Sequence, residues 1–320
     1  MAKPKFAIYW AGSCGGCEIA FLDIREKILA VDEAVDLVFC PCLMDTKYAN
    51  VEAMSDGEID VCLFNGCIRN EENLHIAELL RKKSKVLVAY GSCASEGCIP
   101  GLGNLTDREG IQKYAYEESP STGNPQKTYP QTKTKIKAGE LTLPAMFKYV
   151  RTLGQVVDVD YSMPGCPPVA EQIWAVIEAV LSGNLPPKGS VIGVNPKTVC
   201  DECTRTKDEK RIKAFVRPHL VDPKSIDPEK CLLEQGIICN GPATHAGCGA
   251  LCPEVNLGCR GCYGPAEGIQ DMGGKLAGAI ASIIESDDPE EIERIVAQIV
   301  DPVGTFYRFN LPSSLLGRRV

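Results

Sequence analysis

Cysteine is the residue type in this chain that could do the most chemistry. Of its 17 cysteines, eight fall between positions 200 and 262. Two pairs among them have the spacing C-x-x-C, which is typical of metal ligands. Sets of four sulfur ligands select zinc or iron–sulfur clusters, so the segment predicts two metal sites, with a disulfide framework as the alternative. The eight residues are Cys200, Cys203, Cys231, Cys239, Cys248, Cys252, Cys259 and Cys262.

The beginning of the chain favours metal over disulfides. Residues 5–11 have the pattern of a first strand, which leaves no room for a charged and apolar secretion signal. We therefore expect a cytoplasmic protein, in which thiols stay reduced and dense cysteines bind metal. No apolar run approaches the length of a membrane span. A net charge of −8 without a basic face excludes an ordinary nucleic-acid binder.

Strand-like and helix-like segments alternate along the first part of the chain. The predicted strands cover residues 5–11, 35–39, 59–64, 85–90 and 156–161. The predicted helices cover residues 18–29, 70–83, 145–153 and 170–181. This alternation indicates βαβ units, and therefore an α/β fold with a parallel, doubly wound sheet. The pattern dissolves over residues 107–144, and within this stretch we expect residues 119–137 to form an irregular surface excursion.

A segment rich in proline and glycine at 186–189 indicates a domain boundary. The sequence therefore predicts two domains, 1–187 and 188–320, which agrees with the usual number for this length. After the boundary Pro, Gly and Cys dominate as far as Gly264. That composition is expected where metal, rather than apolar side chains, organises the fold. Two further helices are predicted at 274–286 and 289–299.

Four cysteines of the first domain follow predicted strands. Cys14 and Cys17 come after the first strand, Cys93 after the fourth, and Cys166 after the fifth. Because the carboxyl ends of parallel strands share one edge of a sheet, these thiols should meet at that edge, where such folds bind their ligands. A thioredoxin-like redox pair is the alternative for Cys14 and Cys17. That alternative does not require the other two cysteines, so we favour a cluster.

The remaining cysteines are interpreted as structural, because the other twelve already form three sets of four. They are Cys40, Cys42, Cys62, Cys67 and Cys98. Cys62 lies inside a predicted strand and is expected to be a small core residue.

These motifs resemble the small subunit of nickel–iron hydrogenases. The shared features are the C-x-x-C after the first strand, the turns around Cys93 and Cys166, and the cysteine-rich domain that follows. The resemblance implies a flavodoxin-like domain with a proximal cluster and a C-terminal domain with a medial and a distal one. Carried over by position, all three would be [4Fe–4S] clusters. The proximal ligands would be Cys14, Cys17, Cys93 and Cys166; the medial ones Cys248, Cys252, Cys259 and Cys262; the distal ones Cys200, Cys203, Cys231 and Cys239.

Two positions depart from the pattern of many family members. Cys200 stands where many have histidine, and Cys252 where many have proline and a three-iron cluster. Histidine in place of a thiolate generally raises the potential of a cluster. Three clusters held only by cysteine should therefore have low potentials.

The resemblance is strongest to the cytoplasmic F420-non-reducing (methyl-viologen-reducing) hydrogenases of methanogens. It implies an electron-transfer subunit that performs no bond chemistry itself. Its expected partners are a large subunit that carries nickel and iron, and an iron–sulfur acceptor such as heterodisulfide reductase. The alternatives are the small subunit of an F420-reducing or other cytoplasmic hydrogenase, and a zinc-stapled binding module. A further relative, the cluster-bearing subunit of respiratory complex I, shares the fold of the first domain. That subunit has two adjacent cysteines at its first site, whereas this chain has Cys14 and Cys17 in a C-x-x-C spacing.

Overall fold

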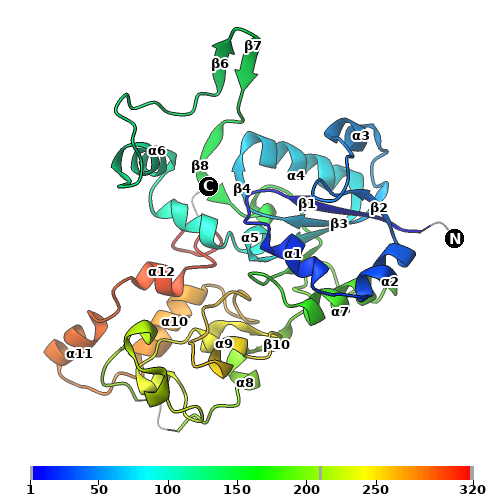
Figure 1. Ribbon diagram of the computed structural model, residues 1–320. Coiled ribbons are helices and arrows are strands. Elements are labelled where there is room, and N and C mark those ends of the chain that lie inside the picture. Colours follow the sequence, from blue (N-terminus) through cyan, green and yellow to red (C-terminus); the bar gives the residue numbers. More distant parts are fainter. Residues whose placement is uncertain (1–2, 209–210, 318–320) are drawn as a thin grey trace.

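A parallel sheet forms the centre of the first part of the chain in the computed structural model, which describes residues 3–208 and 211–317 (Figure 1). Its five strands are all parallel and have the order β2-β1-β3-β5-β9. They are β1 (Lys5–Trp10), β2 (Asp36–Phe39), β3 (Ile59–Asn65), β5 (Ser84–Tyr90) and β9 (Tyr161–Met163). The predicted α/β fold with a parallel sheet is therefore confirmed.

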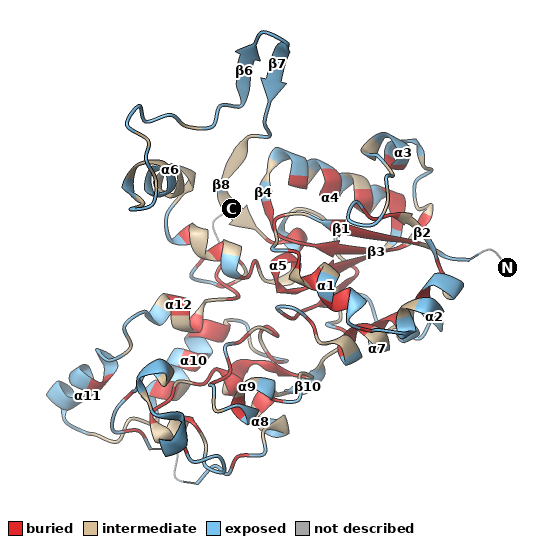
Figure 2. Ribbon diagram, in the orientation of Figure 1, coloured by how far each residue is buried: buried red, intermediate tan, exposed pale blue. Residues whose placement is uncertain are grey.

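Helices cover both faces of this sheet. They are α1 (Gly16–Leu22), α2 (Lys27–Ala34), α3 (Tyr48–Ala53), α4 (Glu71–Lys83), α5 (Ser92–Ser95) and α7 (Ala170–Leu181). Since side chains alternate along a strand, Phe6 and Ile8 of β1 point into one core, and Ala7 and Tyr9 point into another. The sheet is correspondingly buried in Figure 2.

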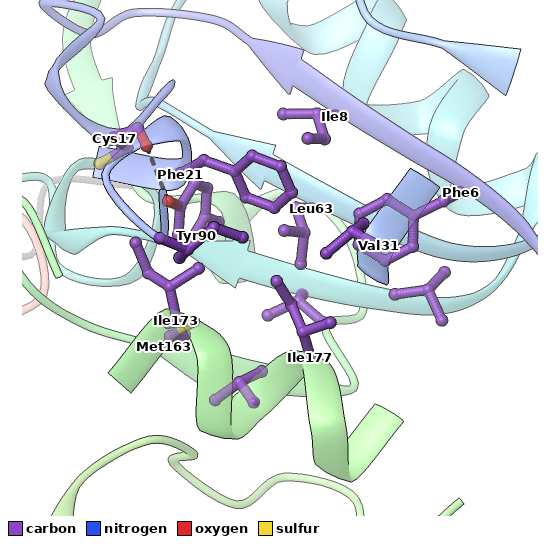
Figure 3. Close-up of a cluster of buried hydrophobic side chains, with 14 of the residues drawn as sticks. Phe6, Ile8, Cys17, Phe21, Val31, Leu63, Tyr90, Met163, Ile173 and Ile177 are labelled. Atoms are coloured by element: carbon purple, nitrogen blue, oxygen red, sulfur yellow. Dashed lines mark hydrogen bonds between the residues drawn. The ribbon is translucent and has the colours of Figure 1, made fainter. Parts of the chain in front are cut away.

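The first of the two cores lies between the sheet and helices α1, α2 and α7, and Figure 3 shows its side chains. Phe21, Val31 and Ile173 project into it from these three helices. At its edge the Tyr90 hydroxyl donates a hydrogen bond to the main-chain carbonyl of Cys17 at 2.7 Å. This bond ties the end of β5 to the start of α1, and thus fixes the two segments that carry Cys93 and Cys17.

Three of the predicted elements differ from the structure. The segment predicted as a helix at 145–153 is strand β8 (Met146–Arg151), which pairs antiparallel with β4 (Ile68–Asn70). Its aromatic and β-branched residues suit a strand, and short apolar runs do not distinguish the two. The predicted helix at 18–29 is two helices, α1 and α2, separated near Arg25, whose φ of 58° no α-helix accommodates.

The strand predicted at 156–161 begins only at Tyr161. The preceding valines pack against the second core from an irregular segment. Asp160 ends that segment by binding the main-chain N–H of Leu87 at 2.8 Å. The apolar run that predicted the strand thus reflects packing rather than pairing.

The predicted surface excursion contains regular structure of its own. Strand β6 (Lys133–Ile136) lies within it. The elements before and after it are η1 (Ile99–Leu105), α6 (Arg108–Lys113), η2 (Tyr114–Glu118), β7 (Gly139–Thr142) and η3 (Leu153–Gln155). Strands β6 and β7 form an exposed hairpin that projects from the sheet (Figure 1).

The C-terminal half has only short elements until its last helices. These short elements are β10 (Asn195–Thr198), α8 (Val199–Glu202), η4 (Pro218–Leu220), η5 (Pro223–Ser225), η6 (Leu233–Gln235), η7 (Gly241–Ala243), β11 (His245–Ala246) and α9 (Leu251–Glu254). The predicted helices near 274–286 and 289–299 are present as α10 (Met272–Ala281) and α11 (Pro289–Val296), and α12 (Pro302–Phe306) follows. Among the described residues, no helix has both the length and the apolar character needed to cross a bilayer.

Candidate metal centres

The carboxyl edge of the sheet brings together four of the predicted site residues, here called the rim set. Cys14 and Cys17 follow β1, Cys93 lies in α5 after β5, and Cys166 follows β9. Burial raises the pKa of the Cys17 thiol, and the neighbouring charges of Glu18, Cys93, Cys166 and Cys14 raise it further. The Cys17 sulfur is therefore near the other three thiols of the set. Their role as ligands stays a prediction.

Glycine makes room for sulfur at this edge. A Cβ atom on Gly91 would lie 2.4 Å from the Cys17 Sγ, and Gly91 also has a φ of 78°. Only glycine satisfies both conditions. The next turn is tied to it, because Ser92 N–H donates to the Gly165 carbonyl at 2.8 Å and Gly165 N–H donates to the Ser92 hydroxyl at 2.9 Å. The backbone thus shapes a space for the thiols before any metal is considered.

Asn65 holds Glu18 beside the rim set. The Asn65 side-chain amide donates to both carboxylate oxygens of Glu18, at 2.7 and 2.8 Å. Burial raises the pKa of Glu18, and the hydrogen bond from Asn65 opposes that shift. Glu18 lies in the first turn of α1, where the helix dipole favours a carboxylate.

A second group of predicted residues, here called the outer set, lines one pocket. Its members are Cys200, Cys203, Cys231 and Cys239. Burial raises the pKa of Cys200 to about 12, and the charge of Cys239 adds to the rise. Gly241 again provides space, because a Cβ atom there would lie 3.2 Å from the Cys200 Sγ and 3.5 Å from the Cys239 Sγ. Valine, leucine and proline side chains line the rest of the pocket together with the basic residues Arg205 and Lys207.

The third group, here called the middle set, lies between the other two. Its members are Cys248, Cys252, Cys259 and Cys262. Burial raises the pKa of Cys262 to about 12. The negative charges of Cys248 in its own set and of Cys166 in the rim set raise this pKa as well. On the other side, Cys259 N–H donates to the Cys239 Sγ of the outer set at 3.2 Å. The middle set thus lies next to the rim set at Cys262 and next to the outer set at Cys259.

Sequence reasoning missed one thiol at the rim. Cys98 is buried, and its Sγ lies 3.5 Å from the Cys166 Sγ. The hydrogen bond from the Cys98 thiol lowers the pKa of Cys166, whose thiolate it stabilises. The sequence carried no signal for this, because Cys98 follows neither a strand nor a C-x-x-C spacing.

The other four cysteines differ in their surroundings. Cys62 is fully buried inside β3, as predicted for a core residue. The Cys67 thiol donates to the Gly12 carbonyl at 3.0 Å. Cys40 and Cys42 line an apolar surface pocket.

That pocket lies directly beside the rim set and has a volume of about 260 Å³. Cys14 and Glu18 line it together with Trp10, Ile19 and Leu43. These three apolar side chains are 41%, 64% and 58% exposed. An exposed apolar patch of this kind is typical of a protein–protein contact.

The donor chemistry of the three sets fits iron–sulfur clusters. Each set offers four thiols, and soft thiolate ligands are those that hold such clusters. Main-chain N–H groups already point at sulfur, as in the bond from Gly16 N–H to the Cys14 Sγ at 3.4 Å. Within residues 3–208 and 211–317, no three His, Cys, Asp or Glu side chains stand in a geometry for a single metal ion.

Comparison with protein families matches residues 14–180 to the family described as NADH ubiquinone oxidoreductase, 20 Kd subunit. The match begins at Cys14 and includes all four cysteines of the rim set. The sequence had suggested a shared first domain with this subunit, and the match supports that relationship.

Two curated relatives are similar over almost the whole chain. The iron-sulfur subunit of the F420-non-reducing hydrogenase of Archaeoglobus profundus is 40% identical, over 99% of this chain and 98% of the relative. The corresponding subunit of the F420-non-reducing hydrogenase of Methanothermobacter marburgensis is 38% identical, over 99% of this chain and 97% of the relative. Among solved structures, the actinobacterial-type NiFe-hydrogenase from Ralstonia eutropha H16 aligns with a TM-score of 0.50 and 18% identity, over 94% of this chain and 90% of that one. That last likeness concerns the fold alone.

Proposed function

Because this chain belongs to the family of iron–sulfur subunits of F420-non-reducing hydrogenases, which are small subunits of nickel–iron hydrogenases, we propose that it conducts electrons from H2 oxidation to an iron–sulfur acceptor. The rim, middle and outer sets would hold a proximal, a medial and a distal [4Fe–4S] cluster. Each cluster would supply a one-electron relay. Two domains, 1–187 and 188–320, would carry one and two of them.

The order of the three sets carries this proposal. The middle set adjoins the rim set through Cys262 and Cys166, and the outer set through Cys259 and Cys239. A series of closely spaced sites is what electron transfer across a protein requires, because the rate falls steeply with distance. Isolated structural metal sites would not need to adjoin one another.

The protein's own residues would set the potential of each relay. Hydrogen bonds to ligand sulfur raise the potential, and Cys259 N–H already donates one to Cys239. The cysteine thiolates at positions 200 and 252 would lower the potentials of their clusters, because each adds a negative charge. We infer low potentials, suited to an acceptor such as heterodisulfide reductase.

The proposed partner at the rim is the large subunit that carries nickel and iron. The exposed Trp10, Ile19 and Leu43 surround Cys14 and would form the centre of that contact. The acceptor would bind at the opposite end, beside the outer set. A cytoplasmic location belongs to the same proposal, and the 17 free cysteines support it.

Metal analysis of the anaerobically purified complex tests the proposal. We expect about 12 iron and 12 acid-labile sulfide per copy of this chain, from three clusters of four irons. Exchange of Cys166→Ser should remove one cluster signal and leave two. Zinc in place of iron would instead support a stapled binding module and overturn the proposal.

A further inference from the structure

Cys98 is the fifth thiol at the rim, and the structure gives it a defined place. It is 1% exposed and packs with Cys93, Cys262 and Phe309. Its Sγ points at the Cys166 Sγ across 3.5 Å, with Cys98 as the donor. A cubane with four irons takes four terminal thiolates, so a fifth thiol in contact with one of them has another role.

The loop that carries Cys98 is built to hold it there. Cys98 has a φ of 49°, in the left-handed region that residues other than glycine rarely adopt. Its N–H donates to the Phe309 carbonyl at 3.0 Å. Pro312 packs against the glycines on either side of Cys98. A Cβ atom on Gly97 would lie 2.3 Å from the Pro312 Cγ, and one on Gly101 would lie 2.4 Å from it. A segment more than two hundred positions away thus maintains the strained turn.

We propose that Cys98 is a positioning residue that donates its S–H hydrogen bond to the Cys166 thiolate and so raises the potential of the proximal cluster. This inference rests on the proposed function, since it needs a cluster held by the rim set. A donor partly neutralises the negative charge on ligand sulfur, which stabilises the reduced state, whose added electron makes the cluster more negative. The thiol is a weak donor, but its burial removes competition from water.

The test compares Cys98→Ala with Cys98→Ser in the purified complex, by redox titration of the proximal cluster signal in electron paramagnetic resonance. We expect Cys98→Ala to retain all its iron and to have a lower midpoint potential. Cys98→Ser keeps a donor and should stay at or above the wild-type potential. Cys62→Ala, which removes a buried thiol inside β3, is the control and should leave the midpoint potential and the iron content of the proximal cluster unchanged.

Two results would overturn the inference. One is an unchanged midpoint potential in Cys98→Ala; the other is loss of the proximal signal, which would make Cys98 a ligand. If Cys98→Ala does not accumulate, a lowered potential in Cys98→Ser decides against the inference. Cys166→Ser separates this inference from its premise. If that variant keeps every cluster signal, the proposed function itself fails; if it loses one, only the role of Cys98 is in question.

Discussion

The hydroxyl of Ser92 donates a hydrogen bond to the main-chain carbonyl of Cys262, 170 positions further along the chain. The same oxygen accepts the Gly165 N–H at 2.9 Å. One small side chain therefore joins the turns after β5 and β9 to the middle set. This contact lies where the proposed path passes from the rim set to the middle set.

Exchange of Ser92→Ala should lower the free energy of unfolding by about 1–3 kcal/mol, because the half-buried Cys262 carbonyl and the buried Gly165 N–H each lose a partner. Chemical denaturation of the purified complex measures it. Ser182→Ala, on an exposed helix end, is the control and should change little. A Ser92→Ala variant within about 0.5 kcal/mol of wild type would contradict the structural role assigned to this residue.

Exchange of Gly91→Ala should prevent the proposed proximal cluster from forming. The added Cβ would occupy the position of the Cys17 sulfur, and φ of 78° would be strained for alanine. Iron analysis should show a loss of about four irons per chain. Gly123→Ala is the matched control, because no atom lies within 4 Å of its added Cβ. Full iron content in Gly91→Ala would mean that the thiols adopt another arrangement when metal is bound.

Asp160 should contribute stability that depends on pH. It is buried, and it accepts hydrogen bonds from Arg81 Nη1 at 2.6 Å and Lys188 Nζ at 2.5 Å. Burial alone would raise its pKa, but these partners and the Leu87 N–H lower it below the usual value. A lowered pKa in the folded state means that the contribution is complete above the unfolded pKa, about 4, and is lost as pH falls through the folded one.

Exchange of Asp160→Asn should therefore cost on the order of 3 kcal/mol at neutral pH, and the difference from wild type should shrink in acid. Unfolding curves at pH 7 and at several values below 4 check it. A difference that stays constant over this range would show that the carboxylate charge is not responsible.

The apolar surface beside Cys14 should decide binding of the large subunit. Exchange of Ile19→Lys puts a charge at the centre of this surface, and affinity should fall at least about 10-fold, or 1.4 kcal/mol. Copurification and titration with the large subunit measure it. Leu220→Lys is the control, since Leu220 is 74% exposed in η4, away from this surface. Equal loss in both variants would point to solubility rather than to the contact.

The grouping of the rim cysteines could be predicted from the sequence, because the carboxyl ends of parallel strands lie at one edge of the sheet. Cys14, Cys93 and Cys166 needed only correct strand ends, and an error of several residues in the last strand did no harm. Cys98 could not be predicted, because its position depends on Phe309 and Pro312, which no local pattern connects to it. Strand β8 was missed for a related reason, since its partner β4 is three residues long.

The contact of Phe309 and Pro312 with the Cys98 loop has a consequence for biosynthesis. A ribosome releases position 98 long before position 309, so the nascent rim loop lacks its support while the intervening two hundred residues are made. If the rim set holds the proposed cluster, its insertion should therefore come late, after the ribosome has made α12 and residues 309–312, and not while the sheet is emerging.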